Sequence, residues 1–177
     1  MAFIDAEVIT LRIVREVFSP RVAVIIVAAS VTGIKVMALV YDNDNVFAKI
    51  LRGEIPSYKV YEDDIALAFL DIMPRIDGHT LVIPKFPART FLDADADKLG
   101  QLIKRVQKVA RAVKNSLGAE GLTLLQSNES AGGQVIFHLH FHLLPRWEGV
   151  ELKPAGSQME APEALQKIQT KIAAALK

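Results

Sequence analysis

Three of the chain's four histidines lie at alternate positions in the segment HLHFHLLPR, residues 138–146. Successive side chains of a β-strand point to opposite faces, so His138, His140 and His142 would share one face, and Leu139 and Phe141 the other. An imidazole at neutral pH can bind a metal, act as a nucleophile or acid–base group, or lie on a solvated surface. The spacing alone leaves these three interpretations open.

A metal site is the first interpretation, because zinc accepts three histidines and a water molecule. The chain contains no cysteine, however, and no acidic residue lies between Glu129 and Glu148. Each histidine ligand would also need a hydrogen-bond acceptor behind it. A purely structural stripe is the second interpretation, although imidazolium groups near pH 6 would repel one another there. We therefore expect no metal and no cofactor.

Nucleophilic chemistry at phosphorus is the third interpretation, because the pKa of a free imidazole lies just below 7 and its neutral nitrogen is a good nucleophile. Such a site needs cations or N–H donors around the phosphate oxygens. The segment SAGGQ, residues 130–134, can supply backbone N–H groups, since glycine lets a backbone approach an anion closely. The fourth histidine, His79, opens the segment GHTLVIPK and could reach the same place.

Local patterns predict the elements that would position these residues, and together they indicate an α+β fold. Helix signals occur from the cap DNDN to Gly53, from Asp95 or Asp97 to Gly118, and from Pro162 onward. Strand signals occur at residues 57–63, 65–72, 78–85, 121–128 and 134–146. The first three strands are close in sequence, which predicts an antiparallel meander.

The composition narrows the class of protein. The 177 residues carry a formal net charge of +1, so no strong electrostatic field favours nucleic acid or an anionic membrane. The apolar run from Val22 to Val31 is too short to span a bilayer, which takes about 20 residues. With no targeting signal evident, we expect a cytoplasmic protein. Residues 1–36 carry no recognisable chemistry, so Met37 is an alternative natural start.

Three blocks of the sequence resemble one known family. NVFAKILRGEIPSYKVYEDD, LAFLDIMPRIDGHTLVIPK and SNESAGGQVIFHLHFHLLPR are similar to the corresponding blocks of the histidine triad (HIT) nucleotide-binding proteins. The resemblance implies a five-stranded antiparallel sheet with one long helix, in a homodimer whose two sheets join into ten strands. It divides the chain into an N-terminal extension (1–36), a HIT domain (37–150) and a C-terminal tail with its own helix (151–177).

The resemblance also implies a mechanism. His140 would attack the α-phosphorus of a purine nucleotide, an AMP or GMP derivative, and form a nucleotidyl-histidine that water then hydrolyses. His142 would contact the phosphate, His138 would help to orient the site, and His79 would complete a relay that tunes His140.

The same resemblance assigns the binding residues. Asp71 would accept hydrogen bonds from the ribose hydroxyls. The phosphate oxygens would be held by Asn128, Gly133, Gln134 and Val135. The base would lie against an apolar wall formed by Val46, Phe47, Ile50, Phe69, Leu70 and Ile72.

Two departures from the family leave the substrate open. Val135 stands where some animal phosphoramidases carry a serine, so a side-chain hydroxyl toward the phosphate is lost. The tail after HLLPRW is also longer and ends differently. The resemblance therefore predicts a phosphoramidase-like nucleotide hydrolase, with a dinucleoside polyphosphate hydrolase or a nucleotide-binding regulatory protein of negligible turnover as alternatives.

Overall fold

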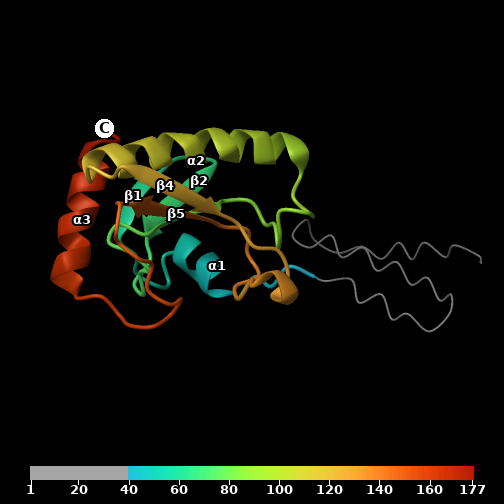
Figure 1. The fold of residues 1–177 in the computed structure, drawn as a ribbon. Helices are drawn as coiled ribbons and strands as arrows, with labels where there is room; N and C mark the ends of the chain where they lie inside the picture. The colour runs from blue at the N-terminus through green and yellow to red at the C-terminus, as the bar shows by residue number, and fades with distance from the viewer. Residues whose placement is uncertain (1–39) are drawn as a thin grey trace, which may run out of the picture. The chain divides into compact units, whose positions relative to one another are not determined.

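The predicted strands form one antiparallel sheet in the computed structural model, which describes residues 40–177. The strands are β1 (Lys59–Glu62), β2 (Ala66–Leu70), β3 (Thr80–Pro84), β4 (Gly121–Leu125) and β5 (Phe141–Arg146). Their order across the sheet is β1-β2-β3-β5-β4, and every neighbouring pair is antiparallel (Figure 1). The predicted α+β fold and the meander of the first three strands are thus confirmed. The predictions for residues 1–36 lie outside the described residues.

Helices cover both faces of this sheet. The long helix α2 (Ala96–Ser116) packs on one face, and the short helix α1 (Val46–Leu51) packs on the other (Figure 1). Along β2, Ala66, Ala68 and Leu70 belong to the core beneath α2, whereas Leu67 and Phe69 belong to the core beneath α1. Because both faces are covered, every position of β2 and β3 is buried, and the strands read as nearly continuous apolar runs.

The helix starts follow the predicted caps. The Asn45 side chain accepts hydrogen bonds from the Phe47 and Ala48 N–H groups, both at 3.0 Å, and Asp95 accepts one from Lys98 at 2.9 Å. These bonds satisfy N–H groups that have no partner inside the helix. The cap at Asn45 also fixes where Phe47 enters the core next to the histidines.

The strand that carries the histidines is shorter than predicted. The sequence predicts a strand over residues 134–146, but ladder pairing begins only at Phe141, so His138 and His140 precede the strand. The reason is that Leu139 donates its N–H to Ala88 in the β3–α2 connection instead of to β3. The alternation of side chains survives, since Leu139 and Phe141 still join the core beneath α2.

The C-terminal segment folds back onto the sheet. The predicted last helix is α3 (Pro162–Ala174), and its Leu165 and Ile172 are buried in the core shared with α2. Before α3, the Lys153 N–H donates to the Arg75 carbonyl at 2.8 Å. The chain therefore passes beside the connection between β2 and β3. Over residues 40–177, none of the helices combines the length and the apolar character needed to cross a bilayer.

Candidate active site

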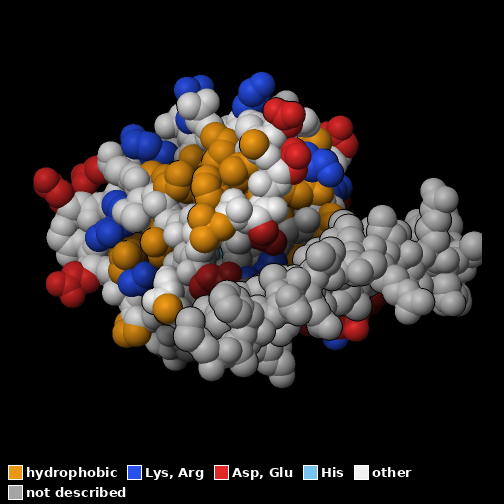
Figure 2. All heavy atoms as spheres, turned by 90° about the vertical axis from the view of Figure 1, so that its right-hand side faces the viewer, with side chains coloured by type: hydrophobic (Ala, Val, Ile, Leu, Met, Phe, Trp, Pro, Cys, Tyr) orange, Lys and Arg blue, Asp and Glu red, His pale blue; other side chains and the backbone are white. Residues whose placement is uncertain are grey.

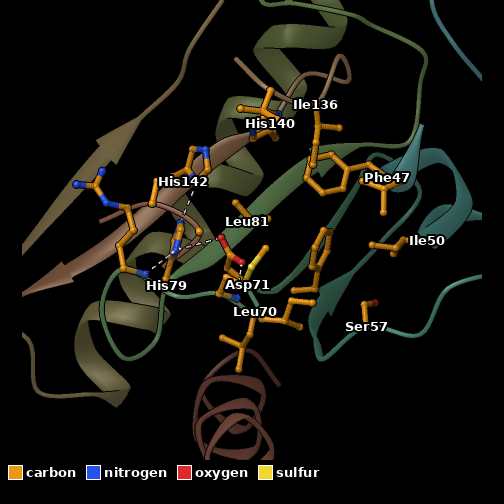
Figure 3. A pocket seen from close by; sticks show the side chains of 18 of the residues that line it. Phe47, Ile50, Ser57, Leu70, Asp71, His79, Leu81, Ile136, His140 and His142 are labelled. Carbon is orange, nitrogen blue, oxygen red and sulfur yellow. Dashed lines mark hydrogen bonds and ion pairs between the residues drawn. The ribbon is translucent and has the colours of Figure 1, made fainter. Parts of the chain in front are cut away.

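A cavity of about 550 Å³ lies beside the histidines, and most of the predicted site residues line it (Figure 3). In Figure 3, His79, Asp71 and His142 are joined by dashed lines, and Phe47 and Ile50 lie on the opposite side of the view. The predicted residues that line the cavity are Val46, Phe47, Ile50, Phe69, Leu70, Asp71, Ile72, His79, Gly133, Val135, His140 and His142. Three predicted residues, Asn128, Gln134 and His138, are not among the lining residues.

His140 is oriented by the backbone of its own segment. Its Nδ1 lies 2.7 Å from the His138 carbonyl oxygen, so Nδ1 carries the proton and donates it to that oxygen. The other ring nitrogen, Nε2, then keeps its lone pair. His140 is 6% exposed, and burial lowers its pKa below the usual value for histidine, so the ring is neutral at pH 7. A neutral imidazole held in one tautomer with a free nitrogen is the form that a nucleophile requires.

His138 is placed differently from its two neighbours. Its Nε2 donates to the Pro84 carbonyl at 3.0 Å, and its Nδ1 accepts a hydrogen bond from the Tyr41 hydroxyl. The side chain is completely buried, with both nitrogens occupied by protein groups. His138 therefore acts on the site through its carbonyl oxygen, which orients His140, and its imidazole has no free nitrogen for a ligand.

His79, His142 and Asp71 form a chain of polar contacts at the cavity wall. His79 Nε2 lies 2.9 Å from His142 Nδ1, and His79 Nδ1 lies 3.3 Å from a carboxylate oxygen of Asp71. Burial and the neighbouring charges lower the pKa of His79 to about 3 and that of His142 to about 4, while burial raises the pKa of Asp71. The His142 ring in turn contacts His140, with 4.9 Å between ring centroids. The contacts thus run from Asp71 to His140 through His79 and His142.

The same three side chains could hold a cation, since one ligand atom from each of Asp71, His79 and His142 lies within 4.8 Å of the others. A metal there would have to replace the hydrogen bond between the two imidazoles, and the set supplies only three ligands. The expectation of no metal stays a prediction.

The glycine-rich loop, residues 127–135, offers fewer free donors than its sequence indicates. The Gly133 and Gln134 N–H groups donate within the loop, to Ser130 and Glu129, both at 3.0 Å. The Val135 N–H makes no hydrogen bond to residues 40–177, and its side chain is 85% exposed. Of the predicted backbone donors, Val135 is therefore the one available to a phosphate oxygen.

The Asn128 and Gln134 side chains hold the loop in place instead of facing the cavity. Asn128 accepts a hydrogen bond from the Phe91 N–H at 2.8 Å and exchanges further bonds with Gln126. Gln134 is 3% exposed and donates to the Arg89 carbonyl at 2.7 Å. Both amides are thus used by the protein. Their predicted contact with phosphate stays a prediction that the described geometry does not favour.

An ion pair clamps the glycine-rich loop in a strained shape. Glu129 has φ 62° and ψ 163°, a backbone conformation that is essentially restricted to glycine and costs about 1–3 kcal/mol in other residues. Arg89 binds both carboxylate oxygens of Glu129, and its guanidinium lies 4.3 Å from the centre of the Phe137 ring. The Glu129 N–H also donates to the Gln134 side chain at 2.9 Å. These contacts together maintain the strained residue.

This arrangement predicts that Glu129→Gly stabilises the protein only when the ion pair with Arg89 is absent. Arg89→Met should remove the clamp and lower the free energy of unfolding by about 1–2 kcal/mol. Adding Glu129→Gly to that variant should restore about 1 kcal/mol, because glycine adopts this conformation without strain. In the parent protein Glu129→Gly should bring no gain, since it also removes the ion pair. Urea unfolding of all four proteins measures the coupling. Equal effects of Glu129→Gly in both backgrounds would contradict the clamp.

The predicted base wall serves the core and the cavity together. Phe47, Ile50 and Phe69 are buried in the core beneath α1 and also line the cavity. Val46 and Ile72 keep 37% and 41% of their surfaces exposed, so they can still be covered by a ligand. The wall is apolar, as expected of a surface that accepts an aromatic ring such as a nucleobase.

Three residues at this site could not be identified from the sequence pattern. Arg75 and Ser127 line the cavity, and Tyr41 binds His138 from behind. Gly133 lies beside Ser127, since a Cβ built on Gly133 would meet the Ser127 hydroxyl oxygen at 3.9 Å. A hydroxyl is thus present near the phosphate loop although Val135 lacks one. The pair Ser127-Asn128 is only a weak sequence signal for such a hydroxyl, because it also fits an ordinary turn.

Comparison with known proteins gives consistent matches. Residues 52–149 match a sequence model of the HIT domain. A Hit-like protein from Bartonella henselae involved in cell-cycle regulation superposes with a TM-score of 0.73 and 54% identity, covering 77% of this chain and 98% of that one. The adenylylsulfatase HINT3 of Arabidopsis thaliana is 40% identical over 64% of this chain and 58% of its own length. The adenosine 5'-monophosphoramidase HNT1 of Candida albicans is 37% identical over 57% of this chain and 69% of its own length.

Proposed function

The chain belongs to the HIT domain family, and from this premise we propose that it cleaves purine nucleotides at the α-phosphorus through a nucleotidyl intermediate on His140. A nucleotide hydrolase activity is supported by the relatives named as an adenylylsulfatase and an adenosine 5'-monophosphoramidase. The observation that carries the proposal for this chain is the state of His140. Its Nδ1 donates a hydrogen bond to the His138 carbonyl, which leaves the Nε2 lone pair free on a side chain that lines the cavity, whereas both ring nitrogens of His138 and of His79 have partners.

The proposed reaction has two steps. The lone pair of His140 Nε2 forms a bond to the α-phosphorus, and the bond from phosphorus to the leaving group breaks with its electron pair. An amine leaving group must take up a proton, for which the His142 side of the contact chain is placed. Water then attacks the phosphorus and passes a proton to the same contact chain, while the bond from phosphorus to Nε2 breaks, its electron pair returns to His140, and the nucleoside monophosphate is released. The Val135 N–H supports this proposal as a donor to a phosphate oxygen, where charge gathers in each step.

The remaining contacts follow from the size and polarity of the cavity. The apolar wall around Phe47 and Ile50 fits a purine, and the Asp71 carboxylate fits the ribose hydroxyls. Asp71 is suited to accept such bonds because its oxygen near His79 is otherwise engaged only at 3.3 Å. A cavity of about 550 Å³ is in the size range of sites that bind small ligands.

A panel of substrates tests the proposed function. It contains adenosine and guanosine phosphoramidates, AMP-lysine and diadenosine polyphosphates, with release of the nucleoside monophosphate measured by chromatography. Calorimetry with AMP is run beside it. Turnover of any member supports a hydrolase, and the preferred member separates the phosphoramidase from the dinucleoside polyphosphate hydrolase. Tight AMP binding with no turnover across the panel would instead favour a nucleotide-binding regulatory protein.

A homodimer is part of the proposal. Among the described strands, β4 pairs only with β5 and is an edge of the sheet, and its Leu124 and Leu125 are 52% and 38% exposed. Figure 2 shows hydrophobic side chains gathered on one face of the molecule. An exposed apolar edge strand is a template for pairing with a second copy. Sedimentation equilibrium that reports a monomer at micromolar concentration would contradict this.

The cytoplasmic location stays a prediction that cell fractionation can test.

A further inference from the structure

Arg75 is the only lysine or arginine among the described residues that line the cavity. It lies in the connection between β2 and β3, four residues before His79, and its backbone N–H lies 3.4 Å from His79 Nδ1. His79 in turn contacts His142 at 2.9 Å. One fixed positive charge thus stands at the histidine end of a cavity whose other lining residues are mostly apolar.

The C-terminal segment holds Arg75 in place and leaves most of its donors unused. The Nε–H of Arg75 donates to the Lys153 carbonyl at 3.0 Å, and the Lys153 N–H donates to the Arg75 carbonyl at 2.8 Å. No carboxylate among residues 40–177 forms an ion pair with Arg75, and its two terminal nitrogens make no hydrogen bond there. A guanidinium with its stem fixed and its terminal N–H groups free is arranged to bind an anion with two parallel bonds.

The positive charge of Arg75 affects the pKa values of two of the histidines. Burial is the main cause that lowers the pKa values of His79 and His142, and the positive charge of Arg75 lowers both further. Arg75 has no such effect on His140. This effect agrees with the position of Arg75, whose backbone N–H lies 3.4 Å from His79 Nδ1 at the His79–His142 end of the cavity.

These positions give an order along the cavity. The apolar wall takes the base, Asp71 takes the ribose, and His140 with the Val135 N–H takes the α-phosphate. The group that lies beyond the α-phosphate, toward His142, is the leaving group. We propose that Arg75 binds the leaving group, and that the site therefore favours nucleotides whose leaving group is an anion, such as a phosphate, a pyrophosphate or a sulfate, over those that release an amine. This inference rests on the proposed function.

The chemistry of the first step explains the preference. When His140 Nε2 bonds to the α-phosphorus, the bond to the leaving oxygen breaks and that oxygen takes the electron pair. A phosphate or sulfate leaves as an anion and needs no proton, so a neighbouring cation stabilises the charge as it develops. An amine leaving group instead needs a proton and gains nothing from a nearby positive charge.

The test compares two substrates in three variants. Adenosine 5'-phosphosulfate releases sulfate, and adenosine 5'-phosphoramidate releases ammonia. Arg75→Gln should lower kcat/KM for the phosphosulfate by about 10- to 100-fold, as expected for a lost bond between charged groups, and change the phosphoramidate by less than about 3-fold. Arg75→Lys should recover part of the loss. Arg111→Gln, which removes the same charge from an exposed position on α2, should change neither rate.

Two results would overturn the proposal. An equal loss for both substrates would place Arg75 at the α-phosphate or in the fold, and no loss for either would leave it without a role. Calorimetry keeps the test independent of turnover. If the parent cleaves nothing, the proposed function fails, yet Arg75→Gln should still weaken binding of ADP by about 10-fold while leaving adenosine binding unchanged. Equal weakening of both ligands would contradict the inference.

Discussion

Replacing His140 with alanine is expected to lower kcat/KM for any substrate that the parent cleaves by at least about 10⁴-fold, the scale seen when an enzyme loses its nucleophile. The physical reason is that no other histidine can take over. The two nitrogens of His138 are bound to Pro84 and Tyr41. His142 is hydrogen-bonded to His79 through Nδ1, so it has only one nitrogen left for the phosphate.

The measurement combines rates with the trapping of an adduct. Acid quenching during turnover, followed by mass spectrometry of peptides, should find the nucleotidyl group on His140 in the parent and nowhere in His140→Ala. AMP affinity should change far less than kcat/KM, and the thermal unfolding midpoint is measured to show that the variant is folded, because losing the buried His140 ring removes one hydrogen bond and its packing on Phe47 and His142. An adduct on a different residue, or undiminished turnover by His140→Ala, would rule out the proposed nucleophile.

Much of the fold was predictable because its determinants are local. The apolar runs of β2 and β3, the cap at Asn45 and the 3–4 spacing of α2 each lie within one short segment. The start of β5 was not predictable in this way. It depends on the Leu139 N–H finding the Ala88 carbonyl in a distant loop, which no pattern within residues 134–146 can indicate.

The candidate site likewise has features that follow from local sequence patterns and features that depend on distant contacts. The alternation of the histidines correctly predicts that His140 and His142 meet, and the distant His79 joins them through the pairing of β3 with β5. The separate place of His138 depends on Tyr41, a residue 97 positions away. Arg75 looks like an ordinary solvated charge in the sequence, and its place in the cavity depends on Lys153, 78 positions away. Roles created by such long-range partners cannot be read from spacing.

Acidification from pH 7 to pH 5 is expected to lower the free energy of unfolding by about 4–6 kcal/mol, well before most carboxylates titrate. Three histidines, His79, His138 and His142, are held neutral chiefly by burial. Burial is the main cause that lowers the pKa of His79 to about 3 and those of His138 and His142 to about 4, and it also lowers the pKa of His140, which acts in the same direction. In the unfolded chain each histidine titrates near 6.5.

Acid lowers the free energy of unfolding because the unfolded chain binds more protons than the folded chain. Above about pH 7 neither the folded nor the unfolded histidines are protonated, so they contribute no pH dependence. Between about pH 6.5 and pH 4 the unfolded chain binds protons that the folded chain excludes, so stability falls as the pH falls. Each histidine contributes a slope of up to about 1.4 kcal/mol per pH unit, and three give up to about 4. The raised pKa of Asp71 acts in the opposite direction and weakens the effect slightly.

Urea unfolding at half-unit steps between pH 7.5 and pH 5 measures this slope. All four histidines of the chain belong to this site, so no histidine elsewhere can serve as a control. The parent is therefore compared with a variant that lacks one of these four. His79→Asn removes one excluded proton, so its slope near pH 5 should be smaller than that of the parent by about 1.4 kcal/mol per pH unit. A parent whose stability is flat from pH 7 to pH 5 would mean that the histidines already titrate normally in the folded state. In that case the burial that keeps His140 neutral would not hold either, so this measurement on folding also tests the form of the nucleophile.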